Sequence, residues 1–202
     1  MTKALFGLSD QELWKLFPIV VSKYQENWAE IYETEKELLE KQIGSDKILR
    51  INHFGSTAVP GLSAKPIIDI LVEVSENTDI DPLAKRIGKI GYINVRSESE
   101  PYPNAVFLKG YAQDGFRGQA FHLHVRNFGD WDELRFRDYL RQHPEVSEEY
   151  GQLKNALGKK FKFDRDSYSV AKTDFVLRIT ELAKRNIPRE ADSFQFSNST
   201  YS

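Results

Sequence analysis

The sequence predicts an α+β fold in which a mixed β-sheet lies between helices at both ends of the chain. Three observations indicate this order. Apolar residues recur at helical spacing over residues 9–42, β-branched runs bounded by turn residues follow over 48–127, and helical spacing returns over 131–184. The 202 residues fit one domain over 1–186, followed by a polar tail at 187–202.

The first helical region is expected to be a pair of helices. Ser9 with Glu12 three residues later is typical of a helix start, and Pro18 ends that short helix. A second helix is expected after Lys23, with Trp28 and later apolar residues on one face. This amphipathic helix would cover the sheet.

The run Ile67–Val74 is the most apolar in the chain, and its β-branched residues suit a central strand. A helix is expected from Pro82 to Gly91. The other expected strands are 48–54, 92–96, 105–109 and 121–127, and the last two are joined by a glycine-rich loop. Three helices, at 131–143, 145–161 and 167–184, form the expected C-terminal helical portion.

Composition excludes several classes of protein. With 28 Lys and Arg against 30 Asp and Glu, the net charge of −2 argues against a broad nucleic-acid surface. The absence of cysteine excludes disulfides, thiolate zinc sites, iron–sulfur clusters and a cysteine nucleophile. There is neither a long apolar segment nor a signal peptide at the start, so we expect a soluble, cytoplasmic protein without a membrane partner.

An acid inside an apolar strand is the first sign of chemistry. Asp69 interrupts Ile67–Val74, and a buried carboxylate needs a partner or a function. A purely structural pairing with Lys65 or a backbone amide stays open. Upstream lies Gly55-Ser56, a turn whose small residues let backbone amides approach phosphates. Twelve residues separate Ser56 from Asp69. This layout resembles that of the DNA polymerase beta-like nucleotidyltransferases.

A longer stretch resembles the GrpB family, which is assigned to the nucleotidyltransferase superfamily. The match runs through residues 53–70, HFGSTAVPGLSAKPIIDI, and continues at His122-Leu123-His124-Val125. Further matching positions are Tyr24, Trp28, 136–141, 143–145, Tyr150, 153–154, Tyr168 and Lys172. The resemblance spans about 20–182. It implies a nucleotidyltransferase-like mixed sheet and phosphate binding by Gly55, Ser56 and Thr57.

The chain departs from the active nucleotidyltransferase pattern at one position. The second acid of the usual Asp-x-Asp pair is replaced by Leu71, and Glu73 lies about 13 Å along the strand from Asp69. His122 and His124 face the same way on a later strand and could substitute. With Asp69, and with His53 as a further candidate, they could hold a divalent metal such as Mg²⁺, Mn²⁺ or Zn²⁺.

Other roles for the two histidines remain open. They could serve in acid–base catalysis or contact phosphate, or they could simply hydrogen-bond to their neighbours. Candidates for a phosphate-binding rim are Lys65, Arg117, Arg126, Tyr168 and Lys172, because Lys and Arg side chains suit an anion. Each of these could instead be a solvated surface residue.

Two functional hypotheses follow. In the first, the chain is a nucleotidyltransferase-like enzyme that binds a nucleotide or a phosphorylated small molecule between the Gly-Ser turn and the Asp69 strand, with Asp69, His122 and His124 as catalytic residues. In the second, the cleft is a binding module or helper domain that has lost transfer chemistry with Leu71. GrpB-like domains also occur fused to dephospho-coenzyme A kinase, although no kinase P-loop is present here. The acceptor and the oligomeric state do not follow from the sequence.

Overall fold

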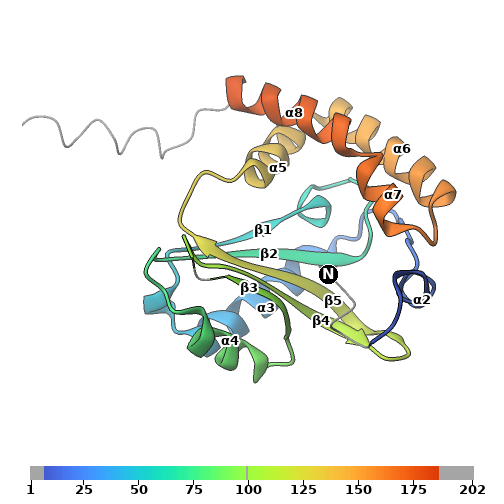
Figure 1. The fold of residues 1–202 in the computed structure, drawn as a ribbon. Coiled ribbons are helices and arrows are strands. Elements are labelled where there is room, and N and C mark those ends of the chain that lie inside the picture. The colour runs from blue at the N-terminus through green and yellow to red at the C-terminus, as the bar shows by residue number, and fades with distance from the viewer. Residues whose placement is uncertain (1–6, 99, 187–202) are drawn as a thin grey trace, which may run out of the picture.

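A five-stranded mixed sheet forms the centre of the computed structural model, which describes residues 7–98 and 100–186. The strand order is β1-β2-β5-β4-β3 (Figure 1). The strands are β1 Arg50–Phe54, β2 Ile67–Val74, β3 Ile93–Glu98, β4 Asn104–Ala112 and β5 Gly115–Asn127. Strands β2 and β5 pair in parallel, and the other neighbours pair antiparallel. The expected polar tail, 187–202, lies outside the described residues.

Helices cover both faces of the sheet. They are α2 Asp10–Leu16, α3 Asn27–Ile43, α4 Ile80–Gly88, α5 Asp132–Gln142, α6 Pro144–Lys160, α7 Arg165–Val170 and α8 Thr173–Asn186. In Figure 1, α3 and α4 lie below the sheet and α5 to α8 lie above it. The predicted α+β class, with helices before and after a mixed sheet, is confirmed.

Strand alternation separates the core from the site. Ile68 and Ile70 of β2 and Leu123 of β5 belong to the main core, which lies between the sheet and the helices α3 and α4. Because successive side chains point to opposite faces, Asp69 and His122 lie on the other face, toward the C-terminal helices. This second face carries both apolar packing and the polar candidates.

Two element predictions differ from the structure. The single helix expected at 167–184 is divided into α7 and α8, with Ala171 and Lys172 between them. At this break the Thr173 hydroxyl donates to the backbone oxygen of Ser169 (3.4 Å), a local bond that competes with regular helix geometry. The loop expected between 109 and 121 is largely strand. Gly110 permits this pairing, because a Cβ there would lie 2.3 Å from the Gln119 oxygen.

No helix in the described part of the chain is both long enough and apolar enough to cross a membrane.

Candidate functional site

The parallel register of β2 and β5 places Asp69 beside His122. Their Oδ1 and Nδ1 atoms are 3.1 Å apart, and the His122 Nε2 is 2.7 Å from the hydroxyl of Tyr111. A neutral ring satisfies both contacts if Nδ1–H donates to Asp69 and Nε2 accepts from Tyr111. Both Asp69 and His122 remain partly accessible, with side-chain exposures of 24% and 19%. The pair can therefore meet a ligand.

The Gly-Ser turn lies directly against this carboxylate. Gly55 has a φ of +72°, and a Cβ at that position would lie 2.2 Å from the Asp69 Oδ2. Both the backbone conformation and the close approach therefore require glycine. The next residues, Ser56–Ala58, form a 3₁₀ turn. This turn aligns Ser56 and Thr57 along the edge of the site.

Thr57 fixes the turn to the start of β2. Its hydroxyl donates to the Ile67 oxygen (3.0 Å) and accepts from the Nε2 of His53 (3.0 Å). The His53 ring stacks on Tyr32 in the core beneath the sheet, with centroids 4.7 Å apart. Burial lowers the His53 pKa to about 4. His53 therefore supports the turn from the face opposite Asp69, and the suggestion that it joins Asp69 as a ligand is wrong.

A small cavity of about 180 Å³ brings most of the predicted residues together. It lies where the Gly-Ser turn and the β2–β5 pair meet the C-terminal helices. Its lining is Gly55, Ser56, Thr57, Lys65, Ile67, Asp69, His122, Lys154, Tyr168 and Lys172. Eight of these ten residues were predicted as site residues, and Lys154 and Ile67 were not.

Lys154 is the least solvated of the three lysines. It is 2% exposed, and its Nζ has no hydrogen-bond partner among the described residues. Nζ lies 4.5 Å from the ring centroid of Tyr150, whose hydroxyl hydrogen-bonds to Ser56. A buried donor without a partner is costly, and an incoming anion would relieve that cost.

The lysines perturb one another. Burial, reinforced by the charges of Lys172 and Lys65, lowers the Lys154 pKa to about 6. Burial and the charges of Arg165 and Lys172 lower the pKa of Lys65 to about 7. The pKa of Lys172 falls to about 8, again chiefly through burial. At neutral pH the cavity is therefore ready to take up protons together with an anion.

The carboxyl of Asp69 behaves in the opposite way. Burial favours its neutral form, but the hydrogen bond with His122 outweighs that effect, together with the charges of His122, His124 and Lys65. The net result is an Asp69 pKa below its usual value. Asp69 is therefore a carboxylate at neutral pH.

His124 does not join Asp69 and His122. It pairs in register with Leu71, and its ring packs edge-on against Phe54 with centroids 5.3 Å apart. Its buried Nδ1 has no hydrogen-bond partner within residues 7–98 and 100–186, and burial lowers its pKa to about 4. Leu71 itself packs against Phe54 and Leu134, so apolar side chains fill the place of the missing acid.

The donors around Asp69 do not fit a divalent cation. Within the described ranges, no three His, Asp or Glu side chains are arranged to hold a metal ion. Asp69 is the only carboxylate that lines the cavity, and three lysines share that cavity with it. Oxygen-rich sites with several carboxylates suit Mg²⁺, whereas ammonium groups repel any cation. A metal bound by Asp69, His122 and His124 stays a prediction that these surroundings disfavour.

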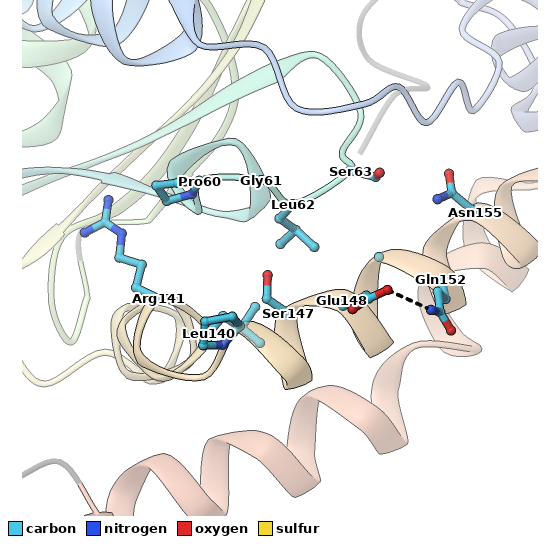
Figure 2. Close-up of a pocket in the computed structure, with 12 residues that line it drawn as sticks. Pro60, Gly61, Leu62, Ser63, Leu140, Arg141, Ser147, Glu148, Gln152 and Asn155 are labelled. Atoms are coloured by element: carbon cyan, nitrogen blue, oxygen red, sulfur yellow. Dashed lines mark hydrogen bonds between the residues drawn. The ribbon is translucent and has the colours of Figure 1, made fainter.

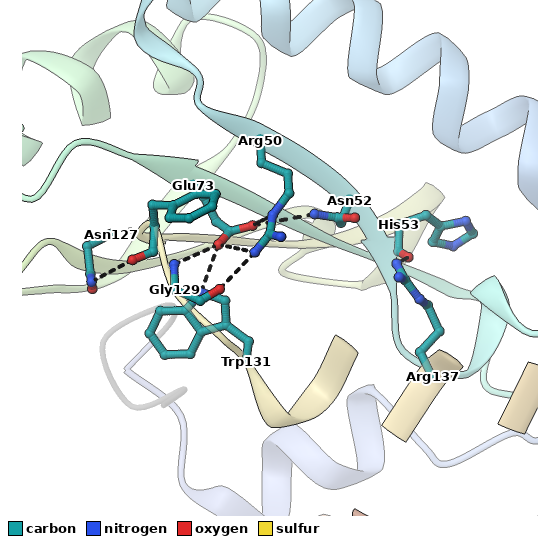
Figure 3. Close-up of polar contacts among 9 residues, drawn as sticks. Arg50, Asn52, His53, Glu73, Asn127, Gly129, Trp131 and Arg137 are labelled. Atoms are coloured by element: carbon teal, nitrogen blue, oxygen red, sulfur yellow. Dashed lines mark hydrogen bonds and ion pairs between the residues drawn. The ribbon is translucent and has the colours of Figure 1, made fainter. Parts of the chain in front are cut away.

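The Glu73 carboxylate is occupied by partners outside the candidate site. Its side chain is fully buried, and the guanidinium of Arg50 contacts both of its carboxylate oxygens (Figure 3). The Gly129 amide (3.1 Å) and the Trp131 indole (3.0 Å) also donate to it. These partners saturate the carboxylate. Glu73 cannot replace the acid that Leu71 displaces.

Two predicted phosphate contacts lie outside the cavity. Arg126 forms an ion pair with Glu133 (3.1 Å) and stacks on Trp131, close to the Glu73 network. Arg117 pairs with Asp114 (2.8 Å) at an exposed hairpin. A larger cavity of about 790 Å³ lies between the Pro60–Ser63 loop and α6 (Figure 2). None of the predicted site residues lines it.

Lys154 is the main residue that the sequence interpretation missed. It follows Tyr150 by four residues on the face of α6 that also buries Gly151 and Gly158. A single lysine on an otherwise buried helical face is a signal that could have identified it. That signal does not say which cavity the lysine would reach.

The fold and the site define an α+β protein whose Gly-Ser turn and strand carboxylate face a cluster of lysines. The chain belongs to the GrpB family, since the family model "GrpB protein" matches residues 18–182. This confirms the resemblance and nearly its full extent. The glutamate-rich protein GrpB of Alkalihalophilus pseudofirmus is 38% identical over 162 residues, which are 78% of this chain and 91% of that protein.

Solved structures and a larger relative complete the comparison. A crystal structure of GrpB from Enterococcus faecalis has a TM-score of 0.71 and 33% identity, covering 81% of this chain and 96% of that one. Cid1 in complex with a UTP analog has a TM-score of 0.42 and 13% identity over 68% of this chain and 40% of that one, too low to support a conclusion. Dephospho-CoA kinase of Mycobacterium leprae is 29% identical over 65% of this chain but only 38% of the kinase.

Proposed function

We propose that this protein binds a phosphate-bearing small molecule, such as a nucleotide, in the cavity between the Gly-Ser turn and the Asp69 strand. The observation that carries the proposal is Lys154, whose buried Nζ has no hydrogen-bond partner among the described residues. Lys65 and Lys172 line the same cavity, so three ammonium groups can surround one phosphate. Ser56 and the adjoining backbone amides supply neutral donors.

Proton uptake should accompany this binding. At pH 7 the pKa of about 6 leaves Lys154 mostly neutral, and Lys65, with a pKa of about 7, is about half protonated. A bound phosphate dianion favours the charged form of each lysine. Binding should therefore tighten as the pH falls from 9 to 7, because fewer protons must then be taken up from solution.

A transferase reaction at the same site is the catalytic version of this proposal. Asp69 is ionised and His122 is hydrogen-bonded to it, so the pair could accept a proton from an attacking hydroxyl. His124, although predicted as catalytic, would act only indirectly because its neighbours are apolar. Release of pyrophosphate from a nucleoside triphosphate, lost in Asp69→Ala, would establish this version.

A non-catalytic binding or helper role is favoured by a separate observation. Leu71 and its apolar neighbours replace the second acid, and Glu73 is saturated by other partners. Thermal stabilisation by a nucleotide without pyrophosphate release, unchanged by a chelator, would support this role. This chain matches 38% of the dephospho-CoA kinase of Mycobacterium leprae, which is consistent with a domain that serves a partner enzyme.

The test of phosphate binding is calorimetric titration of the full chain with inorganic phosphate and with ATP, in EDTA. Lys154→Met should weaken binding at least tenfold, because it removes the least solvated cation. Lys159→Met is the matched control, since Lys159 lies on the exposed face of the same helix. Equal affinities in all three proteins would refute the site, as would a failure of both anions to bind the wild type.

A further inference from the structure

An apolar pocket adjoins the lysine-lined cavity. It has a volume of about 350 Å³ and lies between the chain that follows α2 and the first part of β5. Its apolar walls include Pro18, Val20 and Phe116, and it shares Lys65 and Ile67 with the cavity around Asp69. Because two lining residues are common to both spaces, the two spaces are direct neighbours.

Lys65 stands at the boundary between the two spaces. Its Nζ lies 5.7 Å from the ring centroid of Tyr168, which lines the anion cavity. Lys65 also lines the apolar pocket, and long cationic side chains commonly bury their methylene stems against apolar surface. A ligand that places a phosphate near Nζ would thus extend its organic part along the stem.

The side-chain amide in the pocket wall is already hydrogen-bonded. The Gln119 side-chain amide donates to the backbone oxygens of Pro66 and Ala120, both at 2.9 Å. Phe116 is 43% exposed, and its ring packs on Phe17 with centroids 5.0 Å apart. The pocket therefore offers apolar and aromatic contact rather than hydrogen bonds to sugar hydroxyls.

We propose that this pocket binds the apolar ring of a phosphate ester whose phosphate lies among the three lysines. The inference rests on the proposed phosphate site and adds the chemical class of the attached group. A cavity of about 150 Å³ is enough for a benzene ring, so this pocket can hold one ring or two fused rings.

A second pocket of about 350 Å³ also borders the cavity, through Gly55 and Ser56, and is the competing location. Asp132 and Glu133 contribute two carboxylates to its wall against one cation, Arg137, which already pairs with Asp138 (2.7 Å). Those acids would disfavour an anionic ester. Its exposed residue Leu177 offers a control position that matches Val20, because the two side chains are 59% and 53% exposed.

The experiment compares inorganic phosphate, glycerol 3-phosphate and 1-naphthyl phosphate by calorimetry on the full chain in EDTA. Naphthyl phosphate should bind about tenfold more tightly than the other two, the factor expected from burying about 60 Å² of apolar surface. Val20→Asp should abolish this ratio, whereas Leu177→Asp should keep it. Both substitutions are at exposed positions, so folding is preserved, and the ratio cancels the general effect of the added charge.

Equal affinity for naphthyl and inorganic phosphate would overturn the apolar subsite while leaving the phosphate site intact. Loss of the ratio in Leu177→Asp alone would also overturn it, by moving the ring to the competing pocket. If no phosphate compound binds, the proposed function itself fails, and the subsite fails with it.

Discussion

Lys154→Met should make the unliganded protein more stable, by an amount that depends on pH. The native side chain is 2% exposed, and its Nζ has no hydrogen-bond partner in the part of the chain that the structure describes. Methionine of similar length therefore fills the space without burying a charge or an unsatisfied donor. The same substitution removes the amine on which the proposed phosphate binding depends. Stability and ligand affinity should therefore change in opposite directions.

The pH dependence follows from proton uptake on unfolding. The pKa of Lys154 is about 6 in the folded protein and 10.5 in an unperturbed lysine, so the unfolded chain holds the extra proton across that range. The wild type consequently gains stability as pH rises, at about 1.4 kcal/mol per pH unit for one proton. Between pH 7 and pH 9 the advantage of the methionine variant should shrink by about 3 kcal/mol.

Urea denaturation at the two pH values measures this difference. The wild type, Lys154→Met and the exposed control Lys159→Met are compared, and the control should track the wild type within about 0.5 kcal/mol. An advantage of the methionine variant that is the same at pH 7 and pH 9 would refute a depressed Lys154 pKa. A variant less stable than the wild type at pH 7 would show that the ammonium has a partner.

Three further outcomes are expected. Gly55→Ala should lower the free energy of unfolding, measured by urea denaturation, by about 3 kcal/mol or more, because the new Cβ would collide with Asp69. The control Gly61→Ala, also at positive φ but in open space, should lower it by only about 1 kcal/mol. Glu73→Gln should lower the free energy of unfolding by about 3 kcal/mol, because it breaks a buried ion pair. The control Glu133→Gln, which breaks an exposed ion pair, should lower it by under about 1 kcal/mol. Similar losses in the two variants would contradict the buried network. Phosphate affinity measured by calorimetry should change less than twofold on adding EDTA. A larger loss of affinity would indicate that a metal ion takes part in binding.

The strand that carries Asp69 could be predicted from sequence to the residue. Ile67–Val74 is a strand in both the prediction and the structure, because a β-branched apolar run of this length strongly favours strand over helix. Its pairing could not be predicted in the same way. The contact between Asp69 and His122 depends on the parallel register of β2 and β5, which no local signal encodes.

Long-range partners account for most of what the sequence interpretation missed. Glu73 was recognised as too far from Asp69, but its partners Gly129 and Trp131 lie more than fifty residues away. Lys154 reaches the cavity from α6, and Lys172 reaches it from the break between α7 and α8. The residue types in the sequence suggested a phosphate-binding site, and tertiary packing determines which lysine and arginine side chains line it.

The same packing explains why loss of one acid changes the character of the whole site. With Leu71 in an apolar cluster and Glu73 saturated by Arg50, one carboxylate faces three lysines, and the charge of the cavity lining becomes positive. A positive cavity attracts a phosphate directly and needs no bridging cation, whereas two acids would repel phosphate unless a metal lay between them. In the proposed binding mode the lysines take over the charge neutralisation that a metal supplies at a two-acid site, and binding is coupled to protons rather than to a metal.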